Sequence, residues 1–297
     1  MRETLKGWMA FPAAPKIWDD RMEGSTGLAG CPPSCQACPA QDEREPNMTR
    51  RPIDWDAYLD GFHASFPGIT EDVLARCSSD GRSPYEWLTD DVDRHPRLLD
   101  LGCGSGPARP AGATSWVGLD RSDRELLRAA KLGRGALVRG DITQLPIDDQ
   151  SVDVVTSSMA MMLVEPIDEA LGEIRRVLRN GGELRLLLPA AAPLTMLDRV
   201  RYLRLFWAAG STTKFPPTTM RARAKDTLES LGFTVLSDER ERFELPVLTA
   251  ADADQFINSW YLPSTTDARR ATARGRATSM TPFRIGIPLR RIVARTR

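Results

Sequence analysis

The 297-residue sequence has no excess of either charge, because 40 basic side chains stand against 40 acidic ones. A neutral balance argues against a protein whose whole surface attracts nucleic acid or anionic membranes. The sequence also lacks any apolar run near the roughly 20 residues that a bilayer requires. Its N-terminus lacks the continuous apolar segment of a secretory signal. We therefore expect a cytoplasmic protein with no membrane partner.

Cysteine is scarce, and the five cysteines present are too few for a disulfide-stabilised scaffold of this length. Three of them, Cys31, Cys35 and Cys38, have a C-x3-C-x2-C spacing that resembles the radical S-adenosylmethionine (SAM) signature over eight residues. That family continues into a long series of βα units, which does not follow here. Three thiols without a nearby histidine also make a poor zinc site, so we expect no metal.

The first stretch of the chain differs from the rest. Residues 1–50 contain six prolines and show no sustained apolar period, so we expect a disordered N-terminal extension. Met48 is as plausible an initiator as Met1. Residues 51–95 then show apolar and aromatic positions at helical spacing, which predicts a helical cap. Tyr58 and Phe62 belong to this stripe and are candidates either for core positions or for the wall of a substrate pocket.

The segment RLLDLGCGSGPA, at 97–108, predicts a buried strand that runs into a glycine-rich turn. Asp100 stands near the end of the strand. Gly102, Gly104 and Gly106 alternate through the turn, where glycine lets a ligand approach the backbone closely. The third glycine comes one residue too early for the dinucleotide fingerprint, and no Gly-Lys-Ser/Thr follows as in a P-loop. The turn therefore predicts a ligand site at a strand end without naming the ligand.

Further strands follow in order, and several end in polar residues. Asp120 ends a strand 20 residues after Asp100, where a carboxylate can accept hydrogen bonds from a ribose diol. Asp141 and Ile142 follow a third strand, and Ser157 and Ser158 end a fourth. A helix over 165–180, closed by Asn180-Gly181-Gly182, leads to a fifth strand at 183–189. Strands that alternate with helices predict a parallel, doubly wound sheet.

With these residues the sequence resembles the class I SAM-dependent methyltransferases, within them the small-molecule group with a methyltransferase type 11-like domain. The match runs from about 97 to 190 and extends more loosely to 297. It implies an α/β fold with a Rossmann-like doubly wound, mostly parallel seven-stranded sheet of order 3-2-1-4-5-7-6 and an N-terminal helical cap. It also implies that S-adenosyl-L-methionine is the cofactor, bound by Asp100, Gly102, Gly104, Gly106, Asp120, Asp141, Ile142, Ser157 and Ser158.

The resemblance assigns a role to most of these residues. It implies that Asp120 holds the ribose hydroxyls, that Asp141 accepts the adenine amine, and that Ile142 packs on the adenine ring. Ser157 and Ser158 would line the methyl-donor sulfur.

One position departs from the family pattern. Many relatives place two histidines shortly after the strand-four serines, whereas this chain has Met161 and Met162 there. No catalytic residue can therefore be named, unless His63 serves from the cap. Methyl transfer can rely mainly on proximity and orientation. Met161 and Met162 are expected either to line an adaptable substrate pocket or to pack in the core.

The C-terminal part completes the expected core domain, residues 96–297, with substrate-pocket insertions at about 191–230 and 248–282. Aromatic residues in these insertions, Trp207, Trp260 and Tyr261, are further candidates for pocket walls. Residues 264–297 contain nine arginines against one aspartate, which keeps nucleic acid open as a partner. No RNA-binding module accompanies them, and the tetrapeptide used for base amino groups is absent after strand four, so nucleic acid is the lesser alternative.

The sequence thus predicts a SAM-dependent methyltransferase that acts on an O, N or C nucleophile of a small-molecule metabolite. The alternatives are an RNA or DNA methyltransferase and a catalytically silent SAM-binding protein. The acceptor and the oligomeric state stay open.

Overall fold

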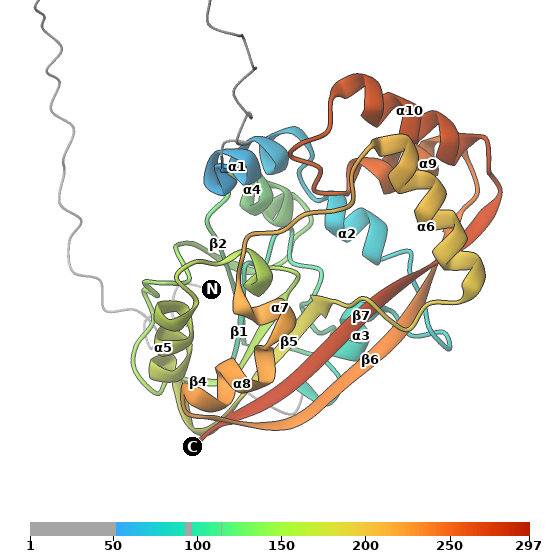
Figure 1. Ribbon diagram of the computed structural model, residues 1–297. Coiled ribbons are helices and arrows are strands. Elements are labelled where there is room, and N and C mark those ends of the chain that lie inside the picture. The colour runs from blue at the N-terminus through green and yellow to red at the C-terminus, as the bar shows by residue number, and fades with distance from the viewer. Residues whose placement is uncertain (1–51, 93–96, 114) are drawn as a thin grey trace, which may run out of the picture. The chain divides into compact units, whose positions relative to one another are not determined.

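The computed structural model describes residues 52–92, 97–113 and 115–297 (Figure 1). The expected extension over 1–50 lies outside these residues, and with it the cluster of Cys31, Cys35 and Cys38. The two cysteines within the described ranges, Cys77 and Cys103, are both buried free thiols.

Seven strands form one sheet. They are β1 (Leu98–Leu101), β2 (Trp116–Asp120), β3 (Ala136–Arg139), β4 (Val152–Ser158), β5 (Leu178–Pro189), β6 (Phe233–Val247) and β7 (Phe283–Thr296). Their order is β3-β2-β1-β4-β5-β7-β6. Strands β1 to β5 pair in parallel, and β7 runs antiparallel to both β5 and β6. The predicted fold class and strand order are confirmed.

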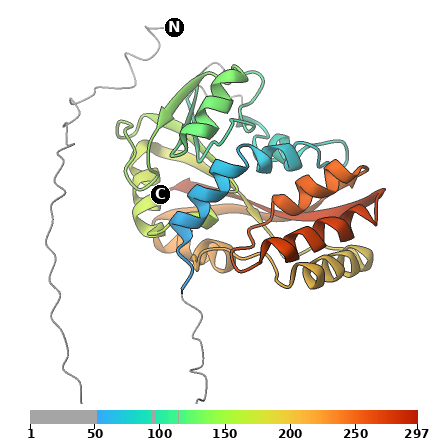
Figure 2. The same cartoon turned by 90° about the horizontal axis from the view of Figure 1, so that it is seen from above.

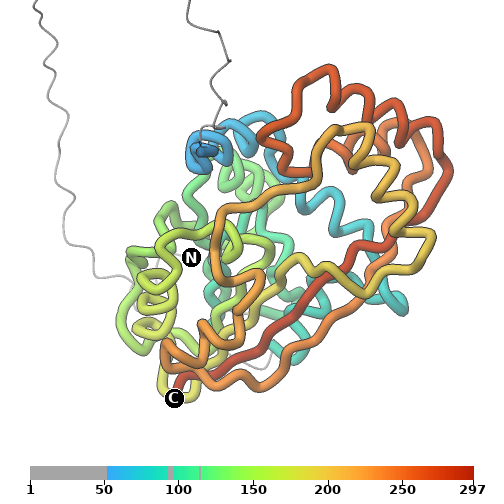
Figure 3. Tube along the Cα trace, in the orientation of Figure 1, coloured from blue at the N-terminus to red at the C-terminus, as the bar shows by residue number. Residues whose placement is uncertain are grey.

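Helices cover the sheet, and those of the C-terminal part gather at the ends of β6 and β7 away from the chain's C-terminus (Figures 1, 2 and 3). They are α1 (Trp55–Ser65), α2 (Ile69–Leu74), α3 (Pro84–Leu88), α4 (Asp123–Lys131), α5 (Ile167–Val177), α6 (Met196–Ala209), α7 (Thr219–Ala222), α8 (Ala224–Ser230), α9 (Ala250–Asn258) and α10 (Asp267–Thr278). A short 3₁₀ turn, η2 (Met161–Leu163), follows β4. None of the helices in the described ranges combines the length and hydropathy needed to cross a bilayer.

Helix α5 ends earlier than the sequence predicts. The expected helix over 165–180 stops at Val177, and Leu178 already pairs with Val152 of the neighbouring strand. Asn180-Gly181-Gly182 therefore lies within β5 and does not cap the helix. Hydrogen bonding to the neighbouring strand is therefore preferred to helix capping at these residues.

The connections between the parallel strands are unequal. Helix α4 links β2 to β3, and α5 links β4 to β5. By contrast, the described residues between β1 and β2, and those between β3 and β4, form turns without a helix. The short turns leave the carboxyl ends of β1 to β4 open to segments from elsewhere in the chain.

The N-terminal helices supply part of that cover. Helix α1 contacts α4, and α2 contacts α9, whereas α3 packs against β4, β5 and β7. The three helices of the segment expected as one helical cap thus pack against different elements. In Figure 2, α1 crosses above the strand ends near α4.

A buried carboxylate joins the C-terminal elements. Asp198, at the start of α6, is fully buried and accepts hydrogen bonds from Arg242 Nε at 2.7 Å and Arg242 Nη2 at 3.0 Å. It also accepts one from the Gly286 backbone N–H at 2.8 Å. Since Arg242 lies on β6 and Gly286 on β7, the carboxylate ties α6 to the antiparallel edge of the sheet. Burial acts to raise the pKa of Asp198, but the Arg242, Thr195 and Gly286 donors hold it below its usual range.

Replacing this carboxylate should destabilise the fold. We expect Asp198→Asn to lower the free energy of unfolding at pH 7 by about 3 kcal/mol, because it leaves the Arg242 charge without its partner. Because the pKa of Asp198 is lowered in the folded state, its ionised carboxylate stabilises the fold fully above about pH 4 and less below it. The loss of unfolding free energy in Asp198→Asn should therefore shrink on acidification. Urea unfolding at several pH values measures this.

The matched control is Asp226→Asn, which breaks an exposed pair with Arg223. It should change the free energy of unfolding by no more than about 0.5 kcal/mol. Equal effects of the two substitutions would contradict the role given to Asp198.

Candidate active site

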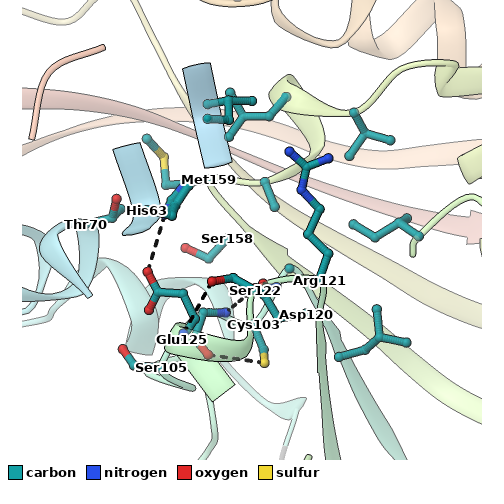
Figure 4. A pocket seen from close by; sticks show the side chains of 18 of the residues that line it. His63, Thr70, Cys103, Ser105, Asp120, Arg121, Ser122, Glu125, Ser158 and Met159 are labelled. Carbon is teal, nitrogen blue, oxygen red and sulfur yellow. Dashed lines mark hydrogen bonds and ion pairs between the residues drawn. The ribbon is translucent and has the colours of Figure 1, made fainter. Parts of the chain in front are cut away.

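A cavity of about 680 Å³ lies where β1, β2, β3 and β4 end. The turns after these strands form its floor, and residues of α1, α2 and α4 form its sides (Figure 4). Because parallel strands present their carboxyl ends at one edge, acids that are far apart in sequence meet here.

The glycine turn after β1 provides part of the floor. Gly102 has φ +61°, and a Cβ there would lie only 2.3 Å from the Ala160 Cβ atom, so no other residue fits without a shift. The Gly104 N–H donates to Asp120 Oδ2 at 2.8 Å. Gly102 and Gly104 line the cavity, whereas Gly106 packs against Arg134 and does not.

Asp120 joins the glycine turn to the start of α4. Its Oδ1 accepts the Ser122 N–H at 2.8 Å, while Oδ2 accepts the Gly104 N–H. Burial raises the pKa of Asp120, although these two backbone donors oppose the shift. Each carboxylate oxygen keeps a further lone pair for a hydroxyl donor in the cavity.

Asp100 is the most deeply buried acid of the site. The residue is 1% exposed, and its Oδ1 accepts a hydrogen bond from Thr156 Oγ1 at 3.0 Å. Its Oδ2 has no hydrogen-bond partner among the described residues. Burial, followed by repulsion from Asp120, raises the pKa of Asp100 to about 7. A buried, unpaired oxygen on the cavity lining suits a donor or a cation supplied by a ligand.

Asp141 and Ile142 lie on the β3 side of the cavity. Asp141 is exposed, and its Oδ1 accepts the Thr143 N–H at 2.8 Å and the Thr143 hydroxyl at 2.7 Å. The backbone donor in particular lowers the pKa of Asp141. Ile142 is buried beside it and offers an apolar surface.

The two serines that end β4 differ in position. Ser158 lines the cavity, and its buried Oγ has no partner within the described ranges. Ser157 Oγ donates to the Leu101 carbonyl at 2.9 Å, and Ser157 does not line the cavity. Its role here is to tie β4 to the end of β1.

The four residues predicted as substrate-pocket candidates are not among those that line the cavity. Phe62, Met161 and Met162 are buried in the main apolar cluster, and Tyr58 packs against the same cluster. The Tyr58 hydroxyl instead accepts the Leu262 N–H at 2.8 Å. For these positions the core interpretation is the one that the structure supports.

The three aromatic residues of the insertions lie in three different environments. Tyr261 lines the cavity, and Trp260 is buried in a second apolar cluster. Trp207 is 75% exposed and is no part of the cavity wall.

A chain of polar contacts that sequence patterns did not reveal crosses one side of the cavity. His63 Nδ1 lies 3.3 Å from Glu125 Oε1, and His63 Nε2 lies 3.5 Å from the Tyr261 hydroxyl. All three residues line the cavity, and Figure 4 shows the His63–Glu125 contact. Glu125 Oε1 also accepts the Gly68 N–H at 2.9 Å, while its buried Oε2 has no described partner. Only the fold unites positions so far apart in sequence.

The inner lining is predominantly acidic. Arg121, an arginine of the cavity lining, is turned toward Asp56 and Asp60, each at 3.2 Å. Within the described residues Asp100 and Asp120 form no ion pair, and the one basic group in contact with Glu125 is the imidazole of His63. The site therefore favours a ligand that carries positive charge and several N–H or O–H donors. Among the described side chains, no group of three or more His, Cys, Asp or Glu residues is arranged to hold a metal ion.

Comparisons with known proteins give this site a family. The family model described as a methyltransferase domain matches residues 99–186, which contain the turns that form the cavity floor. This part of the chain is a class I SAM-dependent methyltransferase domain. The cofactor that this family uses is S-adenosyl-L-methionine, as the resemblance of the sequence implied.

Curated relatives support the same assignment over part of the chain. A malonyl-[acyl-carrier protein] O-methyltransferase of Xylella fastidiosa is 29% identical over 62% of this chain and 64% of its own length. A demethylmenaquinone methyltransferase of Lactobacillus johnsonii is 32% identical over 46% of this chain and 66% of its own length. The chain thus spans just under two thirds of the length of these two relatives.

A solved structure supports the fold. The [4+2]-cyclase SpnF superposes with a TM-score of 0.51 at 20% identity, covering 82% of this chain and 96% of SpnF. At this identity the similarity establishes the shared architecture only.

The buried charge of Asp100 should reduce stability when the cavity holds no ligand. We expect Asp100→Asn to raise the free energy of unfolding at pH 8 by about 1–3 kcal/mol, because the amide carries no charge to bury and still accepts from Thr156. Because the pKa of Asp100 is raised to about 7 in the folded state, the stability that the wild type loses by ionising this buried acid grows from about pH 4 to pH 7. The gain should therefore vanish near pH 4.

Chemical denaturation of the ligand-free protein at several pH values measures this difference. Asp141→Asn is the control, because the pKa of Asp141 is lowered and its charge is exposed. A loss of stability in Asp100→Asn at pH 8, or a gain that does not depend on pH, would contradict the expectation.

Proposed function

We propose that this protein transfers the methyl group of S-adenosyl-L-methionine to an O, N or C nucleophile of a small-molecule metabolite. One observation carries the proposal: the cavity at the strand ends joins a glycine turn to three separate carboxylates, of Asp100, Asp120 and Asp141. The family assignment and the acidic lining support the same activity.

The residues present fit the cofactor. S-adenosyl-L-methionine supplies an electrophilic methyl group on a positively charged sulfonium, next to an ammonium group. Asp100 Oδ2, buried and unpartnered, would accept from that ammonium. Asp120 would accept the ribose hydroxyls through its remaining lone pairs, and Asp141 with Ile142 would hold the adenine. Gly102 and Gly104 keep the floor free of side chains, and Ser158 would face the methyl-donor end.

The acceptor enters the proposal only as a class. The named relatives act on a malonyl group carried by a protein and on a quinone precursor. In this chain the inner cavity holds three acids, Asp100, Asp120 and Glu125, that have no arginine or lysine partner among the described residues, which disfavours a carboxylate acceptor there. A neutral or cationic nucleophile with an apolar body fits the lining better.

His63 is the residue best placed to take a proton from such an acceptor. Its ring lies between Glu125 and Tyr261, so the Glu125 carboxylate can orient the imidazole toward the cavity. We infer that Glu125 is a positioning residue and that His63 takes up the proton that a hydroxyl or amine loses on methylation.

The nucleic-acid alternative loses much of its support. Four arginines of β7 form ion pairs with acids on neighbouring strands: Arg284 with Glu244, Arg290 with Asp238, Arg291 with Glu239 and Arg295 with Glu183. These side chains neutralise the sheet edge rather than present a free basic surface. A silent SAM-binding protein stays an alternative until turnover is measured.

The proposed activity is tested by turnover. The purified protein, incubated with S-adenosyl-L-methionine and a metabolite extract, should yield S-adenosylhomocysteine and a product heavier by one methyl group. Mass spectrometry of both species makes the measurement, with Asp120→Ala at subsaturating cofactor as the control of reduced activity. Turnover only with RNA or DNA would favour a nucleic-acid methyltransferase. No turnover with any acceptor would favour a catalytically silent SAM-binding protein.

His63→Ala should then lower kcat for that acceptor by about 10²–10⁴-fold. Cofactor affinity should change little, because the residues proposed to hold the cofactor are untouched. Removing the base should also flatten the acidic limb of the pH–rate profile, an effect that a merely structural role would not produce. Glu125→Gln should show a smaller loss of kcat, and Tyr261→Phe is the conservative control. An unchanged kcat and pH profile in His63→Ala would refute the role of His63.

A further inference from the structure

Helix α6 is apolar on two opposite faces. Its inner face packs against the fold through Leu205, Ala208 and Ala209, next to the buried carboxylate of Asp198. Its outer face presents large apolar side chains to solvent. Met196 is 76% exposed, Val200 43%, Leu203 69% and Trp207 75%.

These four residues form one continuous stripe. Their spacings of four, three and four residues place them on a single line along the helix, about 16 Å long. Leu197, 56% exposed, widens the stripe at its beginning. The stripe holds five of the nine large apolar residues recorded as exposed over the described part of the chain. A concentration of this kind marks a contact surface rather than scattered surface residues.

The charge beside the stripe is basic. Arg199 and Arg204 flank it on either side, and neither forms an ion pair within the described residues. Arg269 of α10 lies near the end of the helix, because a Cβ on Gly210 would come within 3.5 Å of its Nε. The acid of α6, Asp198, is buried in its pair with Arg242 and contributes nothing to this face.

The surroundings of α6 leave this face accessible. Helix α6 packs on α10 and β7, and Figure 2 shows α6 beside α10 at the outer margin of the described helices. After α6 the chain runs through residues 210–217 to Pro216 and Pro217, which line the cavity. The stripe is thus connected by a short segment to the candidate active site.

We propose that α6 is an interfacial helix that docks on an anionic lipid bilayer, which departs from the sequence-based expectation of no membrane partner. Trp, Leu and Met on one line with arginines at its sides are the composition of helices that lie in the headgroup region. Tryptophan in particular favours that region. Anionic headgroups would neutralise Arg199 and Arg204, whereas packing α6 against α6 of a second copy would bring like charges together. Such docking goes beyond the proposed methyl transfer and does not depend on it.

The test is co-sedimentation of the full chain with lipid vesicles. The wild type should bind vesicles of equal parts phosphatidylcholine and phosphatidylglycerol, and bind phosphatidylcholine alone more weakly. The double variant Leu203→Asp/Trp207→Ser should lower the partition coefficient about tenfold or more. Arg199→Glu/Arg204→Glu should lower it about fivefold or more for each arginine, with a reduced dependence on salt.

Two controls match these variants in exposure and charge. Leu127→Asp alters a 61%-exposed leucine on α4, and Arg223→Glu/Arg240→Glu makes the same change in net charge elsewhere. Both should bind vesicles like the wild type, and all variants should keep the wild-type unfolding midpoint. No vesicle binding, equal binding without anionic lipid, or unchanged binding by the stripe variants would overturn the proposal. A dimer in light scattering that the stripe variants dissociate would assign the face to a second copy instead.

Discussion

The parallel pairing of β1 with β2 on one side and β4 on the other is the constraint on which the site depends. It aligns Asp100 with Gly118 and with Thr156, and so sets the ends of the three strands at one level. Asp120 then reaches the Gly104 N–H, and Thr156 reaches Asp100. A slip of one residue would turn these side chains to the opposite face. The cavity is therefore a property of the register more than of any single loop.

The same arrangement has a cost in stability. Asp100 is a buried acid with one oxygen unpaired, and Glu125 and Ser158 each keep an unpartnered oxygen within the described residues. Buried polar atoms without partners are unfavourable in a ligand-free fold. A cationic, donor-rich ligand removes that cost by supplying the missing hydrogen bonds. The same unpartnered polar atoms thus lower the stability of the ligand-free protein and provide the hydrogen-bond acceptors for the ligand.

Sequence patterns predicted the parts of the site that are local. Asp100, Asp120 and Asp141 each follow an apolar strand, and Gly102 marks a turn, so their place at the sheet edge could be read from order and spacing. The contact of His63 with Glu125 could not, because α1 reaches α4 only through tertiary packing. Met161 and Met162 were ambiguous for a related reason: an apolar side chain beside a site fits the core and the pocket equally well.

The central claim is that this cavity binds S-adenosyl-L-methionine through the acids at the strand ends. Calorimetric titration of the cofactor into the wild type, Asp120→Ala and Asp123→Ala tests it most directly, since Asp123 also lines the cavity but is paired with Arg139 at the surface. We predict saturable binding by the wild type and by Asp123→Ala. Asp120→Ala should bind about 1.5–3 kcal/mol more weakly. No binding by the wild type, or equal affinity in Asp120→Ala, would contradict the claim.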